Sequence, residues 1–263
     1  MNRYEEAAEL FADRVGEEYF DSRSAETAKH IFLKLLEKEE RPLLFLLGEP
    51  GSGKTHMLKT LERVLTDKGW RVFLFNDPFE SGDELTRRLA AAAAIAVDGD
   101  GESLKKPLVD AFGAMPHLVM LDEAQLLNEE VFEYIRILND TGAFRFVMAM
   151  HRKEGEAILS KPHFRSRSHR VVEMGGLDRG EIRRYAQKRL EDHGFDTFAA
   201  MLSEREIGRL YRYTRGNFRM TKRMLQSLFS LMGEARELGR EKFTRPNATL
   251  WCMAALDTGV EHA

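Results

Sequence analysis

The sequence predicts an α/β protein, in which helices cover a parallel sheet, followed by a small all-helical domain. Short apolar runs alternate with helical stretches as far as Gly176, and no strand-like run appears after it. Strands separated by helices form parallel sheets that are covered on both faces. We therefore expect an α/β core domain over residues 1–176 and a helical domain over residues 177–263.

The composition is that of a soluble globular protein, with 43% hydrophobic and 32% charged residues among 263. A single cysteine, Cys252, excludes an internal disulfide and a multi-cysteine metal site, so we expect a reducing cytoplasm. The residues after Met1 are acidic and do not resemble a signal peptide. The most apolar stretch, Leu89–Val97, is far shorter than the roughly 20 residues of a spanning helix. No membrane span is predicted.

Charge is unevenly distributed along the chain. From Thr141 onward there are 23 basic and 15 acidic residues, whereas the preceding part has 17 basic and 28 acidic residues. Such a basic region can form a nucleic-acid or acidic-partner surface, but helices with alternating charges usually owe them to solvation, which is the favoured interpretation here.

The predicted core elements follow from hydrophobic spacing and from Gly and Pro breaks. Continuous apolar runs of strand length indicate buried strands, over Leu43–Leu47, Trp70–Asn76, Leu118–Leu121, Phe144–Met150 and Val171–Met174. Apolar residues at helical spacing indicate helices, over Tyr4–Val15, Ser24–Glu40, Lys54–Lys68, Asp83–Ala96, Ser103–Phe112 and Glu129–Asn139.

The helical domain is predicted from its caps. Asp178 suits the N-cap of a helix that runs to Asp192, and Ser203 with Glu206 has the spacing of a capping box for a helix through Tyr213. Two more helices are expected, over Met220–Leu231 and Pro246–Leu256, with four methionines in the core: Met201, Met220, Met224 and Met232.

A glycine-rich loop between the first strand and the next helix fits the pattern G-x-x-x-x-G-K-[ST] in full. Its backbone N–H groups would surround phosphates at a helix N-terminus, Lys54 would reach the β- and γ-phosphates, and Thr55 would bind Mg²⁺. This predicts a P-loop NTPase that binds ATP through Gly48, Glu49, Pro50, Gly51, Ser52, Gly53, Lys54, Thr55 and His56.

An acidic pair, Asp122 and Glu123, directly follows the third strand, about 65 residues after the loop. In P-loop enzymes such a pair supplies one carboxylate for Mg²⁺ and one for activating the attacking water. We therefore predict Thr55 and Asp122 as Mg²⁺ ligands and Glu123 as the catalytic base of ATP hydrolysis.

These motifs, together with a helical C-terminal domain that contains Gly-x-x-Arg, resemble the AAA+ ATPases. The resemblance implies a sensor 1 residue at the end of the fourth strand, for which His151 is the candidate. It implies a sensor 2 in the helical lid, matched by Arg219, with Arg223 as a substitute. It also implies an arginine finger directed at a neighbouring subunit, best matched by Arg167, then Arg165 or Arg170; a solvated loop remains the alternative.

A narrower resemblance is to the ExeA-type ATPases of the general secretion pathway. It is carried by Glu18-Tyr19-Phe20, by Leu121 to Leu127, and by Gly176 to Leu190, and it places Gln125 beside the site. The resemblance implies a homo-oligomer, with a hexamer as one form, that drives assembly or remodelling of a secretion, type IV-like pilus or DNA-uptake machine. Attachment at the inner membrane would then come from a partner protein.

Two other functions remain open. A DNA-binding AAA+ helper of the transposition kind is supported by the basic C-terminal part. A slow nucleotide-sensing switch is favoured if His151 does not serve as sensor 1.

Overall fold

The structure is a computed structural model that describes residues 2–12, 20–96, 100–161 and 168–260. The chain forms two compact units. One comprises residues 25–174, and the other combines residues 1–24 with residues 175–263. None of the helices in the described ranges is both long and apolar enough to cross a bilayer.

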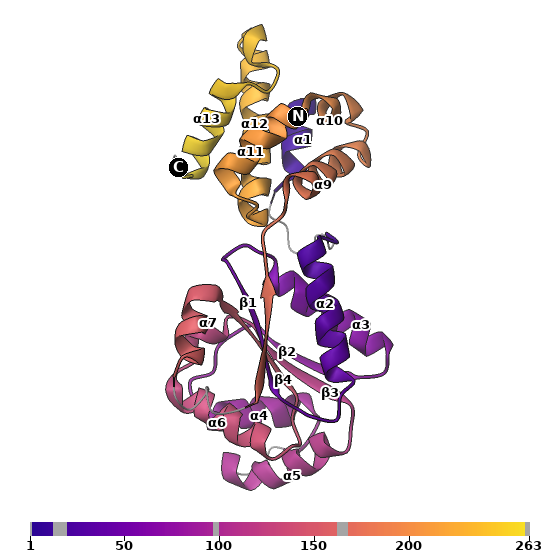
Figure 1. Ribbon diagram of the computed structural model, residues 1–263, viewed down its shortest axis with the longest axis vertical. Helices are drawn as coiled ribbons and strands as arrows, with labels where there is room; N and C mark the ends of the chain where they lie inside the picture. The colour runs from indigo at the N-terminus through magenta and orange to yellow at the C-terminus, as the bar shows by residue number, and fades with distance from the viewer. Residues whose placement is uncertain (1, 13–19, 97–99, 162–167, 261–263) are drawn as a thin grey trace. The chain divides into compact units, whose positions relative to one another are not determined.

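The first unit is built on a five-stranded sheet with the order β2-β3-β4-β1-β5, in which all neighbouring strands are parallel (Figure 1). The strands are β1 (Leu43–Gly48), β2 (Arg71–Phe75), β3 (His117–Leu121), β4 (Phe146–His151) and β5 (His169–Met174). All residues of β1 and β3 are buried, as expected for central strands covered on both faces.

Helices cover both faces of the sheet. Figure 1 shows α2 (Arg23–Leu36) and α3 (Lys54–Asp67) together on one side. The other side carries α4 (Gly82–Ala92), α5 (Gly101–Gly113), α6 (Glu129–Asp140) and α7 (Arg152–Leu159). Along β1, Phe45 and Leu47 belong to the core on the α4–α7 side, as the alternating direction of side chains in a strand requires.

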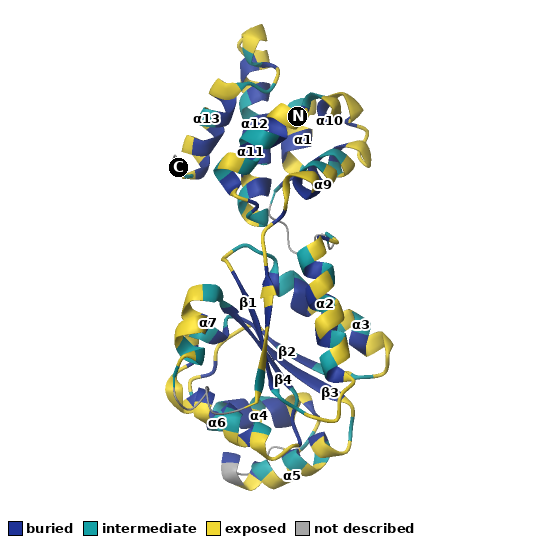
Figure 2. Cartoon of the chain, viewed as in Figure 1, coloured by how far each residue is buried: buried dark blue, intermediate teal, exposed yellow. Residues whose placement is uncertain are grey.

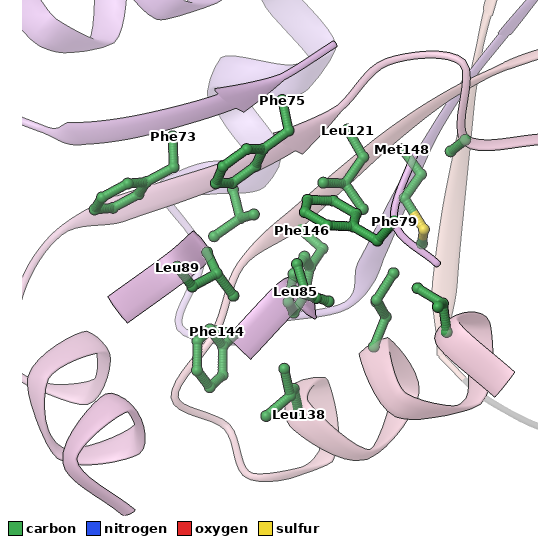
Figure 3. Packing of buried hydrophobic residues seen from close by; sticks show 14 of the residues in the cluster. Phe73, Phe75, Phe79, Leu85, Leu89, Leu121, Leu138, Phe144, Phe146 and Met148 are labelled. Carbon is green, nitrogen blue, oxygen red and sulfur yellow. The ribbon is translucent and has the colours of Figure 1, made fainter. Parts of the chain in front are cut away.

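That core is rich in aromatic rings. Phe73 packs on Phe112 of α5 with ring centroids 5.0 Å apart, and Phe112 packs on Phe144 at 4.9 Å. Figure 3 shows Phe73 and Phe75 of the sheet facing Leu85 and Leu89 of α4. Burying one such side chain stabilises the fold by roughly 1.5–3 kcal/mol. The central strands β1, β3 and β4 accordingly lie in the dark, buried interior of Figure 2, whereas much of the edge strand β5 is exposed.

The second unit is helical. It contains α1 (Arg3–Glu9), α9 (Arg179–Glu191), α10 (Asp196–Met201), α11 (Glu204–Thr214), α12 (Phe218–Glu237), the 3₁₀ turn η2 (Glu241–Phe243) and α13 (Ala248–Thr258). Its core includes the fully buried Met224, Met232 and Trp251. Met201 and Met220 are partly buried against the same cluster.

The N-terminal residues group with the helical unit, whereas the sequence suggested that they belong to the core domain. α1 packs along α12, and Phe11 is buried in the helical core with its ring stacked on Phe229 at 5.9 Å. Asn2 also donates a 2.8 Å hydrogen bond to Glu237 of α12. Because α1 and α12 are far apart in sequence, their pairing leaves no local pattern. The sequence alone therefore did not group the N-terminal residues with the helical unit.

The remaining differences are local. Helix α1 ends at Glu9 rather than Val15, with residues 13–19 outside the described ranges, and α7 and α10 were not predicted. The side chain of Asp178 caps α9 through Glu181 N, as predicted, and Glu181 completes a capping box that was not predicted. Ser203 is the N-cap residue of α11, but its side chain makes no cap hydrogen bond, so the capping box predicted there is wrong.

Candidate functional site

The predicted phosphate loop lies at the carboxyl end of β1, which ends at Gly48, and leads directly into α3 at Lys54. Gly53 is the N-cap residue of α3 and has a φ of +98°, a left-handed conformation that side chains other than glycine rarely adopt. The loop therefore needs glycine here to turn the chain from a buried strand into the first turn of a helix.

Lys54 lies inside this loop. Its side chain is buried, and Nζ donates hydrogen bonds to the main-chain oxygens of Gly48 at 3.0 Å and Glu49 at 3.2 Å. A buried ammonium group is costly unless it is hydrogen-bonded, and these carbonyl groups satisfy it. The result is a positive charge held at the centre of the loop, where an anionic phosphate would bind.

A second unusual group in the loop is the hydroxyl of Ser52. Its oxygen is buried and has no hydrogen-bond partner within the described structure. Buried polar groups nearly always have a partner, so this hydroxyl is available to a ligand bound in the loop. The oxygens of a phosphate would accept a hydrogen bond from Ser52.

Thr55, on the first turn of α3, connects the loop to β3. Its hydroxyl donates a 2.6 Å hydrogen bond to Oδ2 of Asp122, which is buried. The other oxygen of Asp122 accepts a 2.9 Å hydrogen bond from the main-chain N–H of Glu123. A hydroxyl and a carboxylate at this distance are oxygen donors of the kind that Mg²⁺ prefers, so the residues fit the predicted metal.

Glu123 follows at the end of β3 in a left-handed conformation, with φ 49° and ψ 33°. Gln125, in the next turn, donates from Nε2 to Oε2 of Glu123. His151 Nε2 lies 3.5 Å from the same carboxylate oxygen. The main-chain N–H of His151 donates to Oε1 of Gln125 at 3.2 Å, which completes a small network.

Strand order explains why these residues meet. β4 lies between β1 and β3, with Gly48 paired to His151 and Leu121 paired to Met148. The carboxyl ends of parallel strands share one edge of the sheet, where ligands of α/β proteins bind. Lys54, Thr55, Asp122, Glu123 and His151 are all brought to that edge.

Arg152 was not predicted as part of this region. It begins α7 directly after His151, and its guanidinium lies 3.6 Å from Glu49 of the loop and 2.9 Å from Glu173 of β5. An isolated arginine after a strand carries no distinguishing pattern, so only the fold could identify it.

The other predicted residues lie elsewhere. Arg165 and Arg167 are outside the described residues. Arg170 is exposed on β5 and pairs with Leu44, near the amino end of the sheet and away from the phosphate loop of its own chain. Arg219 and Arg223 are exposed on the first turns of α12, in the helical unit. His56 is half-buried on α3.

Comparison with known families agrees with this geometry. Residues 37–159, which include the loop, the acidic pair and β4, match the family model described as AAA domain. This stretch of the chain is similar to AAA domains. With the parallel sheet and the helical C-terminal part, this match supports the fold of a P-loop AAA+ protein. No curated protein matches the chain significantly.

Several solved structures share the fold. Cdc6p from Pyrobaculum aerophilum has 17% identity and a TM-score of 0.61, over 88% of this chain and 66% of that one. Drosophila ORC bound to DNA has 12% identity and a TM-score of 0.69, over 99% and 67%. The S. cerevisiae Hsp104:casein complex has 15% identity and a TM-score of 0.56, over 89% and 41%. This chain thus spans less than two thirds of the length of Cdc6p and of Hsp104.

Proposed function

We propose that this AAA+ domain hydrolyses ATP at the edge of the sheet where Lys54, Thr55, Asp122 and Glu123 meet. The observation that carries the proposal is the 2.6 Å bond from Thr55 to Asp122, since it joins the phosphate loop to the acidic pair. Lys54 binds the β- and γ-phosphates, and Thr55 and Asp122 bind Mg²⁺. The metal would neutralise charge on the phosphate oxygens, and Glu123 accepts a proton from the attacking water.

Three more residues complete the proposal. His151, at the end of β4 and beside Glu123, acts as sensor 1. Arg219 acts as sensor 2 from the lid. Arg167 acts as an arginine finger toward a second copy of the chain, which implies a homo-oligomer, with a hexamer as one form.

The decisive experiment separates binding from hydrolysis. Glu123→Gln should bind an ATP analogue with an affinity close to that of the wild type and should hydrolyse ATP at least about 100-fold more slowly, because only water activation is lost. Glu130→Gln, at an exposed carboxylate on α6, is the matched control and should retain full turnover. A Glu123→Gln variant that hydrolyses ATP at the wild-type rate would contradict the assignment.

The arginine finger can be tested by mixing variants. Arg167→Ala retains the nucleotide site, Lys54→Ala retains the finger, and a mixture of the two should recover hydrolysis that neither shows alone. If sedimentation shows ATP-dependent association and no recovery occurs at any ratio, Arg167 is not the finger, and Arg165 should be tested next.

For the partner, we propose a secretion, type IV-like pilus or DNA-uptake machine that the ATPase assembles or remodels in the cytoplasm or at the inner membrane. The support is the ExeA-type resemblance, carried in part by Leu121 to Leu127 around Glu123 and Gln125. Co-purification of the Glu123→Gln variant, trapped with ATP, with components of such a machine would test it. Capture only by other classes of protein would contradict it.

A DNA-binding helper is the second candidate, and α11 and the start of α12 favour it. Between residues 205 and 223 there are seven basic residues, while Glu206 is the single acidic one. Exposed positions in this span are Arg205, Arg212, Arg215, Arg219 and Arg223. The similar Drosophila ORC structure contains DNA. DNA that raises the ATPase rate and binds more weakly as salt rises would favour this function, because lysine and arginine contacts to phosphates release counterions.

A further inference from the structure

The segment after Glu123 forms a short turn that folds back on the catalytic carboxylate. Glu123 is one of three non-glycine residues with positive φ in the described ranges, and the 3₁₀ turn η1 (Ala124–Leu126) follows it directly. A non-glycine residue in this conformation is uncommon and is often found at functional sites. The turn brings the side chain of Gln125 to Glu123.

Gln125 joins two structural elements. Its Oε1 accepts a hydrogen bond from the main-chain N–H of His151, the last residue of β4. Since that N–H can only donate, the oxygen of the amide has to face it, and Nε2 is left to donate to Glu123. The amide orientation is therefore fixed, and the catalytic carboxylate is tethered to the main chain at the end of β4.

The tether leaves one carboxylate oxygen available. Gln125 Nε2 and His151 Nε2 both approach Oε2 of Glu123. No described group donates a hydrogen bond to Oε1, and the side chain of Glu123 is 40% exposed. A half-exposed carboxylate held at one oxygen presents the other in a defined direction, which a base needs if it is to accept a proton from a positioned water.

We propose that Gln125 is a positioning residue for ATP hydrolysis: it holds Oε2 of Glu123, so that Oε1 is directed at the attacking water. The inference rests on the proposed role of Glu123 as the base. Gln125 acts through Glu123 and does not touch the nucleotide, so its loss slows turnover and leaves ATP binding unchanged.

The test compares turnover and binding in two variants. Gln125→Ala should lower kcat about 10–100-fold, as misplacement of a catalytic group does. KM and the Kd of an ATP analogue should change less than about twofold. Gln125→Glu keeps an acceptor for His151 N–H but places a second carboxylate against Glu123, so it should lower kcat at least as much. If the kcat of Gln125→Glu matches that of the wild type, the hydrogen bond from Gln125 to Glu123 does not determine turnover, and the inference is overturned.

A double-mutant cycle excludes a merely structural role. With Glu123→Gln already present, adding Gln125→Ala should change the single-turnover rate less than about twofold, because Gln125 then has no carboxylate to position. Leu126→Ala, in the same turn and exposed, is the matched control and should retain wild-type kcat.

Two results would overturn the inference without affecting the proposed function: an equal loss from Gln125→Ala in both backgrounds, or an unchanged kcat in that variant. A wild-type chain that binds ATP without hydrolysing it would instead contradict the proposed function, and the positioning role with it.

Discussion

The indole N–H of Trp251 donates a 2.6 Å hydrogen bond to Oε2 of Glu206, and both residues are buried in the helical unit. Arg209, one turn along α11, forms an ion pair with the other oxygen of the same carboxylate. A carboxylate that is both hydrogen-bonded and paired can be accommodated inside a small core. The contact fixes α13 against α11.

Trp251→Phe should therefore destabilise the helical unit by more than the loss of buried ring area alone would predict. The substitution leaves a buried carboxylate oxygen without its donor, which costs about 1–3 kcal/mol. The measurement is urea unfolding followed by circular dichroism at pH 7. Trp70→Phe, at a half-buried tryptophan in the other unit, is the matched comparison. A loss below about 0.5 kcal/mol would show that the bond to Glu206 contributes little.

His117 should make the stability of the core depend on pH. Burial, with smaller contributions from the charges of Arg41 and Arg145, lowers the pKa of His117 from 6.5 to about 4. Its Nδ1 pairs with Met115 O at 3.0 Å, and Nε2 accepts from Arg145 N at 3.2 Å, so the ring is held neutral. Below pH 6.5 the unfolded chain binds a proton that the folded chain takes up only near pH 4.

The stability contributed by neutral His117 is thus complete above pH 6.5 and is lost between pH 6.5 and about 4. The loss is about 3 kcal/mol in total, from roughly 1.4 kcal/mol for each pH unit of the shift. Measured across this window, the unfolding free energy of the wild type should fall by about this amount relative to that of His117→Phe. Parallel curves for the two proteins would contradict the prediction.

Lys54→Ala should abolish measurable ATP binding, since the phosphates would then lack the buried cation of the loop. Calorimetry with ATP and Mg²⁺ is the direct measurement, and Lys59→Ala, an exposed lysine on the same helix, is the control. Unchanged ATP affinity in Lys54→Ala would remove the loop from the nucleotide site.

Gly216→Ala should destabilise the helical unit strongly. Gly216 has a φ of +82°, and an added Cβ would lie 2.2 Å from the main-chain oxygen of Leu177. Gly239→Ala is the matched control, because its φ of +66° is also left-handed but nothing lies within 4 Å of the added Cβ. We expect Gly239→Ala to lower the free energy of unfolding by about 1 kcal/mol, from the backbone conformation alone, and Gly216→Ala to lower it by more. Equal melting temperatures of the two variants would contradict the steric argument.

The phosphate loop and the acidic pair could be identified from sequence because each is a local pattern set by backbone chemistry. The roles of Gly53 and Lys54 can be inferred from the neighbouring strand and helix alone. The helical unit could also be anticipated, since Asp178 caps α9 through a residue three positions away.

Contacts between distant segments could not be identified in this way. The bond from His151 N to Gln125 depends on β3 and β4 being neighbours, and sequence spacing does not specify strand order. Ser203 and Glu206 have the spacing of a capping box, yet Glu206 instead turns inward to Trp251, 45 residues away. The buried hydrogen bond from the Trp251 indole to Glu206 outweighs the local preference of Glu206 for a capping box.

The packing of α1 on α12 has a consequence for synthesis of the chain. About 200 residues separate the two helices, so at 5–20 residues per second α1 leaves the ribosome roughly 10–40 s before its partner exists. Residues 25–174 can fold within that interval, while Ala7, Ala8 and Phe11 stay exposed on the nascent polypeptide. We therefore expect the α/β unit to fold first during translation, and α1 to pack on α12 afterwards.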